Sequence, residues 1–169
     1  MKRDRVVDLV YVALYAALFI VLDYASRFFG SMPNGGSLGL GSLAILTAAY
    51  HLGWKKGVVV GLLSIPLQYL VSGFWFTPTW PIIGFVLDYV IPFGVYGLAP
   101  LFPDWKVIKT GVIITNLIRL TSHIVVGALL WDVPWWGSVT YNAGYMIPTL
   151  VLGAILMPLI LSRLPKKTL

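Results

Sequence analysis

Residues 116–136 read NLIRLTSHIVVGALLWDVPWW, an apolar run that also holds one Arg, one His and three Trp around an Asp. The run belongs to a hydrophobic segment at about 107–131. Roughly 17–25 apolar residues are enough for a helix to cross a bilayer. Ionisable groups inside such a helix are costly and are functional candidates by default. The stretch therefore predicts a membrane helix with a functional polar face.

The composition of the whole chain supports this interpretation. Of its 169 residues, 59% are hydrophobic and only 11% are charged, whereas about a quarter are charged in soluble domains. The chain has no Cys, which excludes disulfides, thiolate metal sites and thiol nucleophiles. The net charge is +6, but the basic residues lie at the ends of hydrophobic segments. That placement suits anionic lipid headgroups better than nucleic acid.

The hydrophobic segments predict an all-α integral membrane protein with six transmembrane helices in a single domain, residues 1–169. Short polar or Gly/Pro-containing breaks separate the segments. The expected helices lie at about 6–25, 38–53, 57–73, 81–99, 107–131 and 138–162.

The distribution of charge predicts the orientation of these helices. Most Lys and Arg residues lie at the N-terminus, in alternate loops and at the C-terminus, so both termini should be cytoplasmic. The other loops, 26–37, 73–80 and 131–137, then face outward. These three loops carry most of the Trp residues, which form either an interfacial belt or an outward-facing aromatic pocket.

Three ionisable residues lie well inside the predicted helices, away from their ends: Asp88, Arg119 and His123. Arg119 and His123 are four residues apart and share one helical face, which Asn116 and Gly127 continue. An Asp88–Arg119 ion pair that only stabilises packing is one explanation. However, together with Asn142 these groups are more numerous than the cohesion of six short helices requires, which favours a binding site.

Enzymatic explanations fit poorly. The chain has no HExxH pair and no phosphate-binding GxxxxGK[ST] loop. Ser122 adjoins His123 but points to another helical face, so the two do not form a catalytic dyad. Binding or transport is the simpler hypothesis. A carboxylate near several aromatic rings suits a flat, nitrogen-rich cation or zwitterion, because cation–π contacts contribute about 0.5–2 kcal/mol.

Small residues mark places where helices can approach closely. Gly53, Gly57 and Gly61 are most simply explained by packing within the chain. Ala13 and Ala17 form a second stripe, for which a partner protein competes with internal packing.

Four stretches carry a family resemblance. NLIRLTSHIVVGALLW resembles the N-x-x-R-x-x-x-H-x-x-x-G-x-x-x-W pattern on helix five of the thiamine-specific substrate-binding subunits (S-components) of energy-coupling-factor (ECF) transporters. SVTYNAGYMIPT, LDYVIPFGVYGLAPLF and GSLGLGSLAI are similar to segments of helices six, four and two of that family. The resemblance spans nearly the whole chain, with the same six-helix plan and cytoplasmic termini.

The resemblance implies a thiamine site. In it Asp88 would contact the thiazolium or aminopyrimidine ring, His123 and Asn142 would donate or accept hydrogen bonds, Gly127 would leave room, and Trp131 would stack. Gly137 stands where a stacking Tyr is common in the family, so either Trp135 or Trp136 is the candidate replacement. Aromatic residues before helix four complete the set, with Trp75, Phe76 and Trp80 as candidates.

The resemblance also implies partners. Ala13 and Ala17 would dock a transmembrane coupling subunit, and two ATPase subunits would supply energy, so the chain itself needs no cofactor and is not an enzyme. It would be a multi-pass protein of the prokaryotic cell membrane. Two alternatives stay open: an S-component for a related vitamin or pyrimidine precursor, and a structural membrane subunit.

Overall fold

The computed structural model describes residues 2–32, 35–72 and 82–164, and it confirms an all-α fold. The elements are α1 (Lys2–Ser26), η1 (Arg27–Phe29), α2 (Gly41–Leu52), α3 (Trp54–Ser72), α4 (Ile82–Phe85), η3 (Val86–Val90), α5 (Ile91–Tyr96), η4 (Ala99–Leu101), α6 (Thr110–Leu130) and α7 (Trp135–Arg163). Of these, η1 and η4 are 3-10 turns and η3 is a π-helical turn that joins α4 to α5.

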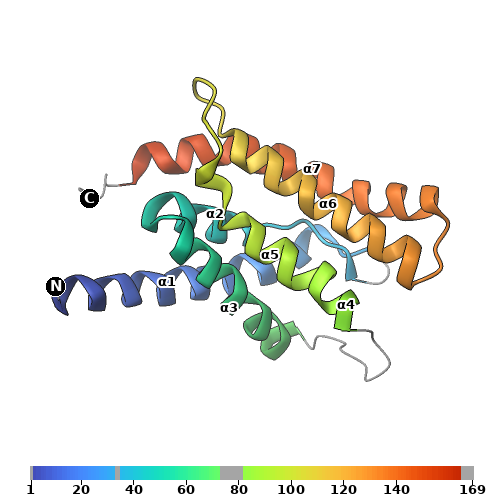
Figure 1. Cartoon of the computed structure of the whole chain (residues 1–169), viewed down its shortest axis with the longest axis horizontal. Coiled ribbons are helices and arrows are strands. Elements are labelled where there is room, and N and C mark those ends of the chain that lie inside the picture. The colour runs from blue at the N-terminus through green and yellow to red at the C-terminus, as the bar shows by residue number, and fades with distance from the viewer. Residues whose placement is uncertain (1, 33–34, 73–81, 165–169) are drawn as a thin grey trace.

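The long helices run along the long axis of the molecule (Figure 1). Helix α6 packs along α7, α1 packs along α2 and α3, and α5 lies between α3 and α6. The first turn of α1 and the last turn of α7 lie at one end of the bundle, and the connection between α6 and α7 lies at the other. This arrangement places the start and the end of the described chain on the same side.

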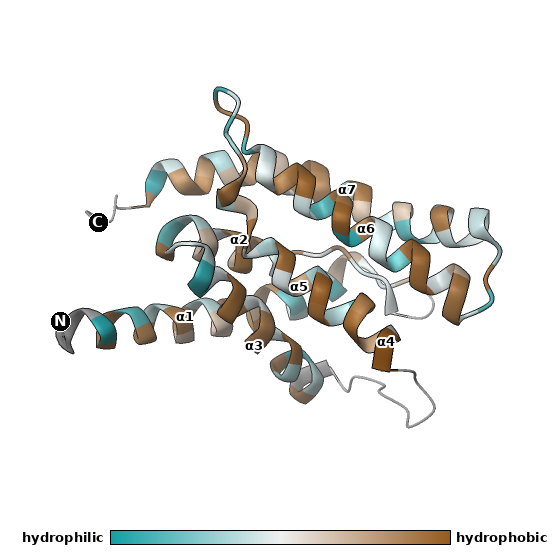
Figure 2. Cartoon of the chain, in the orientation of Figure 1, coloured by the Kyte–Doolittle hydropathy of each residue, from teal (hydrophilic) through white to brown (hydrophobic). Residues whose placement is uncertain are grey.

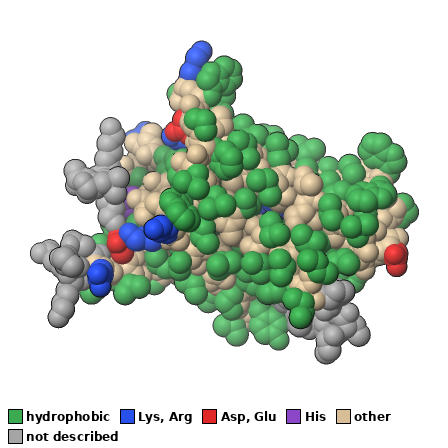
Figure 3. All heavy atoms as spheres, viewed as in Figure 1, with side chains coloured by type: hydrophobic (Ala, Val, Ile, Leu, Met, Phe, Trp, Pro, Cys, Tyr) green, Lys and Arg blue, Asp and Glu red, His purple; other side chains and the backbone are tan. Residues whose placement is uncertain are grey.

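Three helical segments are long and apolar enough to cross a membrane: Arg5–Phe29, Thr110–Leu130 and Trp135–Arg163. Two shorter apolar segments, Gly41–Leu52 and Ile82–Tyr96, accompany them. Hydrophobic residues are found along all the long helices (Figure 2), and hydrophobic side chains cover much of the face seen in Figure 3. On α1 alone Val6, Leu9, Val10, Leu14 and Val21 are exposed. A surface of this kind suits lipid rather than water.

Several helix ends differ by three or four residues from those expected, and two of these differences have a clear local cause. The last helix begins at Trp135, not near 138, so the preceding loop is only residues 131–134. Pro134 fixes this start, and its carbonyl accepts a hydrogen bond from the Ser138 N–H at 3.0 Å. Helix α6 begins at Thr110 rather than near 107, because residues 105–108 form a tight hairpin.

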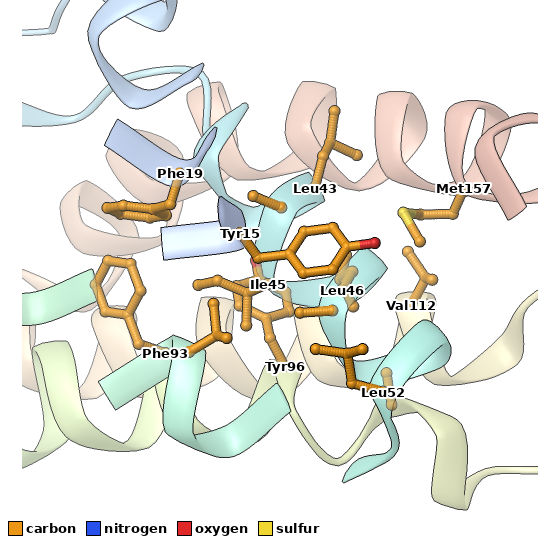
Figure 4. Close-up of a cluster of buried hydrophobic side chains, with 14 residues drawn as sticks. Tyr15, Phe19, Leu43, Ile45, Leu46, Leu52, Phe93, Tyr96, Val112 and Met157 are labelled. Carbon is orange, nitrogen blue, oxygen red and sulfur yellow. The ribbon is translucent and has the colours of Figure 1, made fainter. Parts of the chain in front are cut away.

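The hydrophobic core surrounds α2. Nearly every residue of this helix is buried, as expected for a helix that is apolar on all sides. Figure 4 shows the cluster around it, in which Phe19 of α1 meets Phe93 of α5 edge to face at 5.6 Å between ring centroids. Tyr96 is completely buried in the same cluster. The core thus fixes the position of α5, which continues into the turn that carries Asp88.

Glycines allow α3 to approach its neighbours closely. A Cβ added at Gly57 would lie 2.5 Å from the Cβ of Ala49, and one at Gly61 would lie 2.2 Å from the Phe93 carbonyl oxygen. The expectation that these two glycines serve packing within the chain is confirmed. Gly53 has a different role: its φ of +90° lets the chain turn between α2 and α3.

Candidate functional site

Asp88 lies in the π-helical turn η3, and the local sequence explains that turn. Pro92 lacks an N–H, and its ring would clash with the carbonyl of residue 88 in a regular helix. The backbone instead opens by one residue, and the Ile91 N–H bonds to the Val86 carbonyl. The Ser122 hydroxyl of α6 donates to the Leu87 carbonyl. These bonds hold Asp88 against α6.

His123 of α6 is the hydrogen-bond partner of Asp88. Its Nδ1 lies 2.7 Å from the Asp88 Oδ1, and the two side chains are only 14% and 16% exposed. Arg119, one turn earlier, donates from Nε to His123 Nε2 at 3.1 Å. The alternative of a direct Asp88–Arg119 ion pair is therefore wrong among the described residues, because the imidazole stands between the two charges.

This geometry defines the protonation of the imidazole. A guanidinium has no acceptor, so His123 Nε2 must accept the hydrogen bond from Arg119. The proton of the neutral ring is then on Nδ1, from which it is donated to Asp88. Asp88 consequently acts as a carboxylate acceptor. No described residue bonds to its second oxygen, Oδ2.

Arg119 is fixed from the opposite side by α5. Its Nη1 donates to the Tyr96 hydroxyl at 3.3 Å, and that hydroxyl donates to Asn116 Oδ1 at 2.8 Å. The guanidinium carbon also lies 5.5 Å from the Phe93 ring centroid. The polar stripe expected on this helix is thus a continuous chain from Asn116 through Arg119 to His123. Sequence reasoning missed Tyr96, because a residue eight positions after Asp88 lies about 80° away from it around a regular helix.

Asn142 belongs to a second polar cluster, on α7. It is buried, it accepts a hydrogen bond from the Tyr145 hydroxyl at 2.7 Å, and its Nδ2 bonds to the Ser138 carbonyl at 2.9 Å. The Tyr145 ring lies 6.5 Å from the His123 ring, between centroids. Tyr145 therefore joins the two clusters, and its i+3 spacing from Asn142 was the sequence signal for it.

Gly127 lies where α6 meets α7. A Cβ there would lie 2.3 Å from Ser138 Oγ, which itself donates to the Ile124 carbonyl at 2.8 Å. The structure therefore gives Gly127 a packing role at this crossing.

A hollow of about 380 Å³ lies beside these clusters. Tyr145 and Pro148 line it from α7, and the chain between α1 and α2 lines it from the other side. That chain is bound to α7 through hydrogen bonds from the Gly36 N–H to the Tyr141 hydroxyl, at 3.0 Å, and from the Gly39 N–H to Thr149 Oγ1, at 2.9 Å. A larger groove between α5 and α6 is almost entirely apolar, and its lining does not include Asp88 or His123.

The remaining candidates lie outside these clusters. Trp131 ends α6 and is half exposed, and Trp136, in the first turn of α7, is 78% exposed. Ala13 and Ala17 are exposed on α1. The candidates between α3 and α4, which are Trp75, Phe76 and Trp80, lie outside the described residues.

A lipid-facing helical bundle with partly buried, hydrogen-bonded charges beside a hollow is typical of a membrane protein that binds or transports a small molecule. Comparisons with known proteins name the family. The model of the thiamine transporter protein family (Thia_YuaJ) matches residues 9–169. The chain therefore belongs to this family, and it is a membrane transport protein rather than an enzyme.

Individual relatives agree with this assignment. The thiamine transporter ThiT of Bacillus subtilis (strain 168) is 28% identical over 186 residues, which cover 98% of this chain and 95% of the relative. A solved structure of ThiT from Listeria monocytogenes has the same fold, with a TM-score of 0.71 at 21% identity. That match covers 96% of this chain and 97% of the other.

Proposed function

We propose that this chain is the thiamine-binding S-component of an ECF transporter, and that thiamine binds at the Asp88–His123 pair. The observation that carries the proposal is the partly buried carboxylate whose Oδ1 is bonded to His123 and whose Oδ2 bonds to no described residue. Thiamine contains a permanently charged thiazolium and an aminopyrimidine with N–H donors. A carboxylate with an open oxygen complements either group.

The surrounding groups suit the rest of the ligand. Tyr145 and Asn142 offer a hydroxyl and an amide next to the imidazole. Trp131 and Trp136 lie at the end of the bundle that carries the α6–α7 connection. In the proposal they stack on the ligand as it enters from that side, together with residues between α3 and α4.

Orientation and partners are further parts of the proposal. The chain crosses the membrane six times with both termini cytoplasmic, which is supported by the basic residues near the end where α1 begins and α7 ends. Ala13 and Ala17 lie on an exposed, apolar face of α1. This face docks a membrane coupling subunit, and ATPase subunits drive the reorientation that releases thiamine inside.

The test is a titration of the purified protein in detergent with thiamine, in which binding is monitored by tryptophan fluorescence. Ligand stacking quenches the emission of the wild type. Asp88→Asn removes the charge with almost no change of shape, and it should weaken binding at least roughly 30-fold, about 2 kcal/mol.

The matched control is Asp132→Asn. Asp132 is exposed with a φ of +51°, a conformation that Asn also adopts readily. The control should change affinity by less than about twofold. Equal effects of the two substitutions would remove Asp88 from the site. Quenching by a pyrimidine precursor but not by thiamine would overturn the choice of ligand.

A further inference from the structure

The chain between η4 and α6 forms a hairpin that projects from the side of the bundle. In Figure 1 it points away from the side of the bundle, beyond the outer edge of α6 and α7. Its tip is residues 105–108, where Trp105 and Ile108 exchange two backbone hydrogen bonds of 3.1 and 2.9 Å. Lys106 sits in the turn with a φ of +54°. We call residues 105–108 the tip hairpin.

Contacts at its base hold the tip hairpin in place. Lys109 pairs with Asp104 at 2.5 Å, and its ammonium group lies 5.5 Å from the Tyr50 ring centroid of α2. The Thr110 hydroxyl donates to the Pro103 carbonyl. The projection is therefore an ordered feature that is tied to the core.

The tip hairpin presents an apolar surface and one cation. Trp105 is 64% exposed and Val107 is 76% exposed. The Lys106 ammonium lies 5.7 Å from the Trp105 ring centroid. Because Lys109 pairs with Asp104, the nearest acidic charge is already compensated, and Lys106 gives the tip hairpin a net positive charge. Figure 3 shows this basic and hydrophobic end of the projection.

The position of the tip hairpin along the membrane normal follows from α6. This helix has 21 residues, so it is about 31 Å long and matches a hydrocarbon core of about 30 Å. The hairpin directly precedes the first turn of α6, which places it at headgroup depth. Because it projects from the side of the bundle rather than continuing the line of α6 (Figure 1), it extends along the membrane surface.

We propose that the tip hairpin is an anchor for anionic phospholipid headgroups. Lys106 binds the lipid phosphate, while Trp105 and Val107 insert at the boundary between headgroups and acyl chains. A surface of two apolar side chains and one cation is far smaller than the roughly 800 Å² that each partner of a stable protein complex buries. Charge and depth both favour lipid as the occupant. This site is separate from the proposed thiamine site and does not depend on it.

The absence of Cys from the chain allows a clean test. Val107→Cys in the full chain is labelled with an environment-sensitive fluorophore, and the protein is placed in nanodiscs of phosphatidylcholine with increasing phosphatidylglycerol. Headgroup-level nitroxide lipids should quench the label, and quenching should rise with phosphatidylglycerol. Lys106→Gln should raise the phosphatidylglycerol fraction needed for half-maximal quenching about fivefold, whereas Lys106→Arg should not.

Phe28→Cys provides the matched control. Phe28 is 81% exposed and lies in η1, which directly follows the C-terminal end of α1, at the opposite end of that helix from the N-terminus. Its label should not respond to Lys106→Gln. The proposal is overturned if the label at residue 107 remains in water in every bilayer. It is equally overturned if Lys106→Gln leaves the phosphatidylglycerol dependence unchanged, or if the label is shielded only when a second membrane protein is added.

Discussion

Replacing Gly127 by Ala tests whether this residue holds α6 against α7. The new methyl carbon would lie 2.3 Å from Ser138 Oγ, more than 1 Å closer than the 3.4 Å at which ordinary contact begins. Ser138 cannot yield without cost, because its hydroxyl donates to the Ile124 carbonyl and lies 3.3 Å from the amide nitrogen of Asn142. The two helices must therefore separate, or these bonds must break.

The expected cost follows from these two routes. Overpacking a well-packed contact costs about 1–3 kcal/mol, and losing a hydrogen bond costs about 1 kcal/mol. The higher helix propensity of Ala than of Gly offsets up to about 1 kcal/mol of this cost. The net loss of unfolding free energy is about 1–3 kcal/mol, which corresponds to a fall of roughly 2–10 °C in the unfolding temperature.

The assay is thermal unfolding of the detergent-solubilised protein without ligand, with a double-mutant cycle as the control. Ser138→Ala removes the oxygen that the new methyl group strikes and leaves the Cβ, which would lie 3.2 Å away. The double variant should therefore be more stable than Gly127→Ala alone, even though Ser138→Ala by itself is destabilising.

One result would refute the packing argument. If Gly127→Ala unfolds at the wild-type temperature and only thiamine affinity falls, then Gly127 serves to leave room for the ligand, as the family resemblance implied. An absence of rescue by Ser138→Ala would also contradict the geometry.

Two further predictions concern α3 and α1. Gly61→Ala should lower the unfolding temperature by several degrees, because its Cβ would lie 2.2 Å from the Phe93 carbonyl oxygen. The control Gly94→Ala, on α5, should be neutral or stabilising, because the nearest atom to its Cβ is 3.8 Å away. Equal shifts of the unfolding temperature in a thermal melt would contradict this. Replacing both Ala13 and Ala17 by Trp should abolish thiamine uptake by cells while the purified protein still binds thiamine, and Ser at both positions should preserve uptake. Uptake by the Trp variant would exclude this face as the docking surface.

The sequence predicted the polar groups of the site better than their pairing. Asp88, His123 and Asn142 stood out because ionisable and amide groups are costly in apolar helices, and the four-residue spacing correctly placed Arg119 beside His123. The partner of Asp88 depends on how the turn carrying it is rotated against α6, and the non-local bond from Ser122 to the Leu87 carbonyl fixes that rotation. Helical periodicity contains no such information.

Other features had at most a weak local signal. Tyr96 and Tyr145 were missed because tyrosine is common in membrane helices and does not draw attention as a buried charge does. Residues 107 and 108, the second half of the hairpin before α6, were assigned to the helix because the turn is made by Lys106 at a positive φ, where glycine is the usual signal. The ligand roles of Trp131 and Trp136 stay predictions, as do those of the candidates between α3 and α4.

The π-helical turn at Asp88 has a consequence for how the proposed binding site can change. One additional residue rotates everything beyond it by about 100° relative to an uninterrupted helix. The direction in which the side chains of α4 and of the turn point is therefore independent of the direction in which those of α5 point. In α5, Phe93 and Tyr96 pack in the core. Substitutions in α4 or in the turn that adapt the proposed site to another ligand need not shift the core residues of α5. The same break in register that presents the carboxylate thus lets ligand specificity diverge while the bundle stays intact.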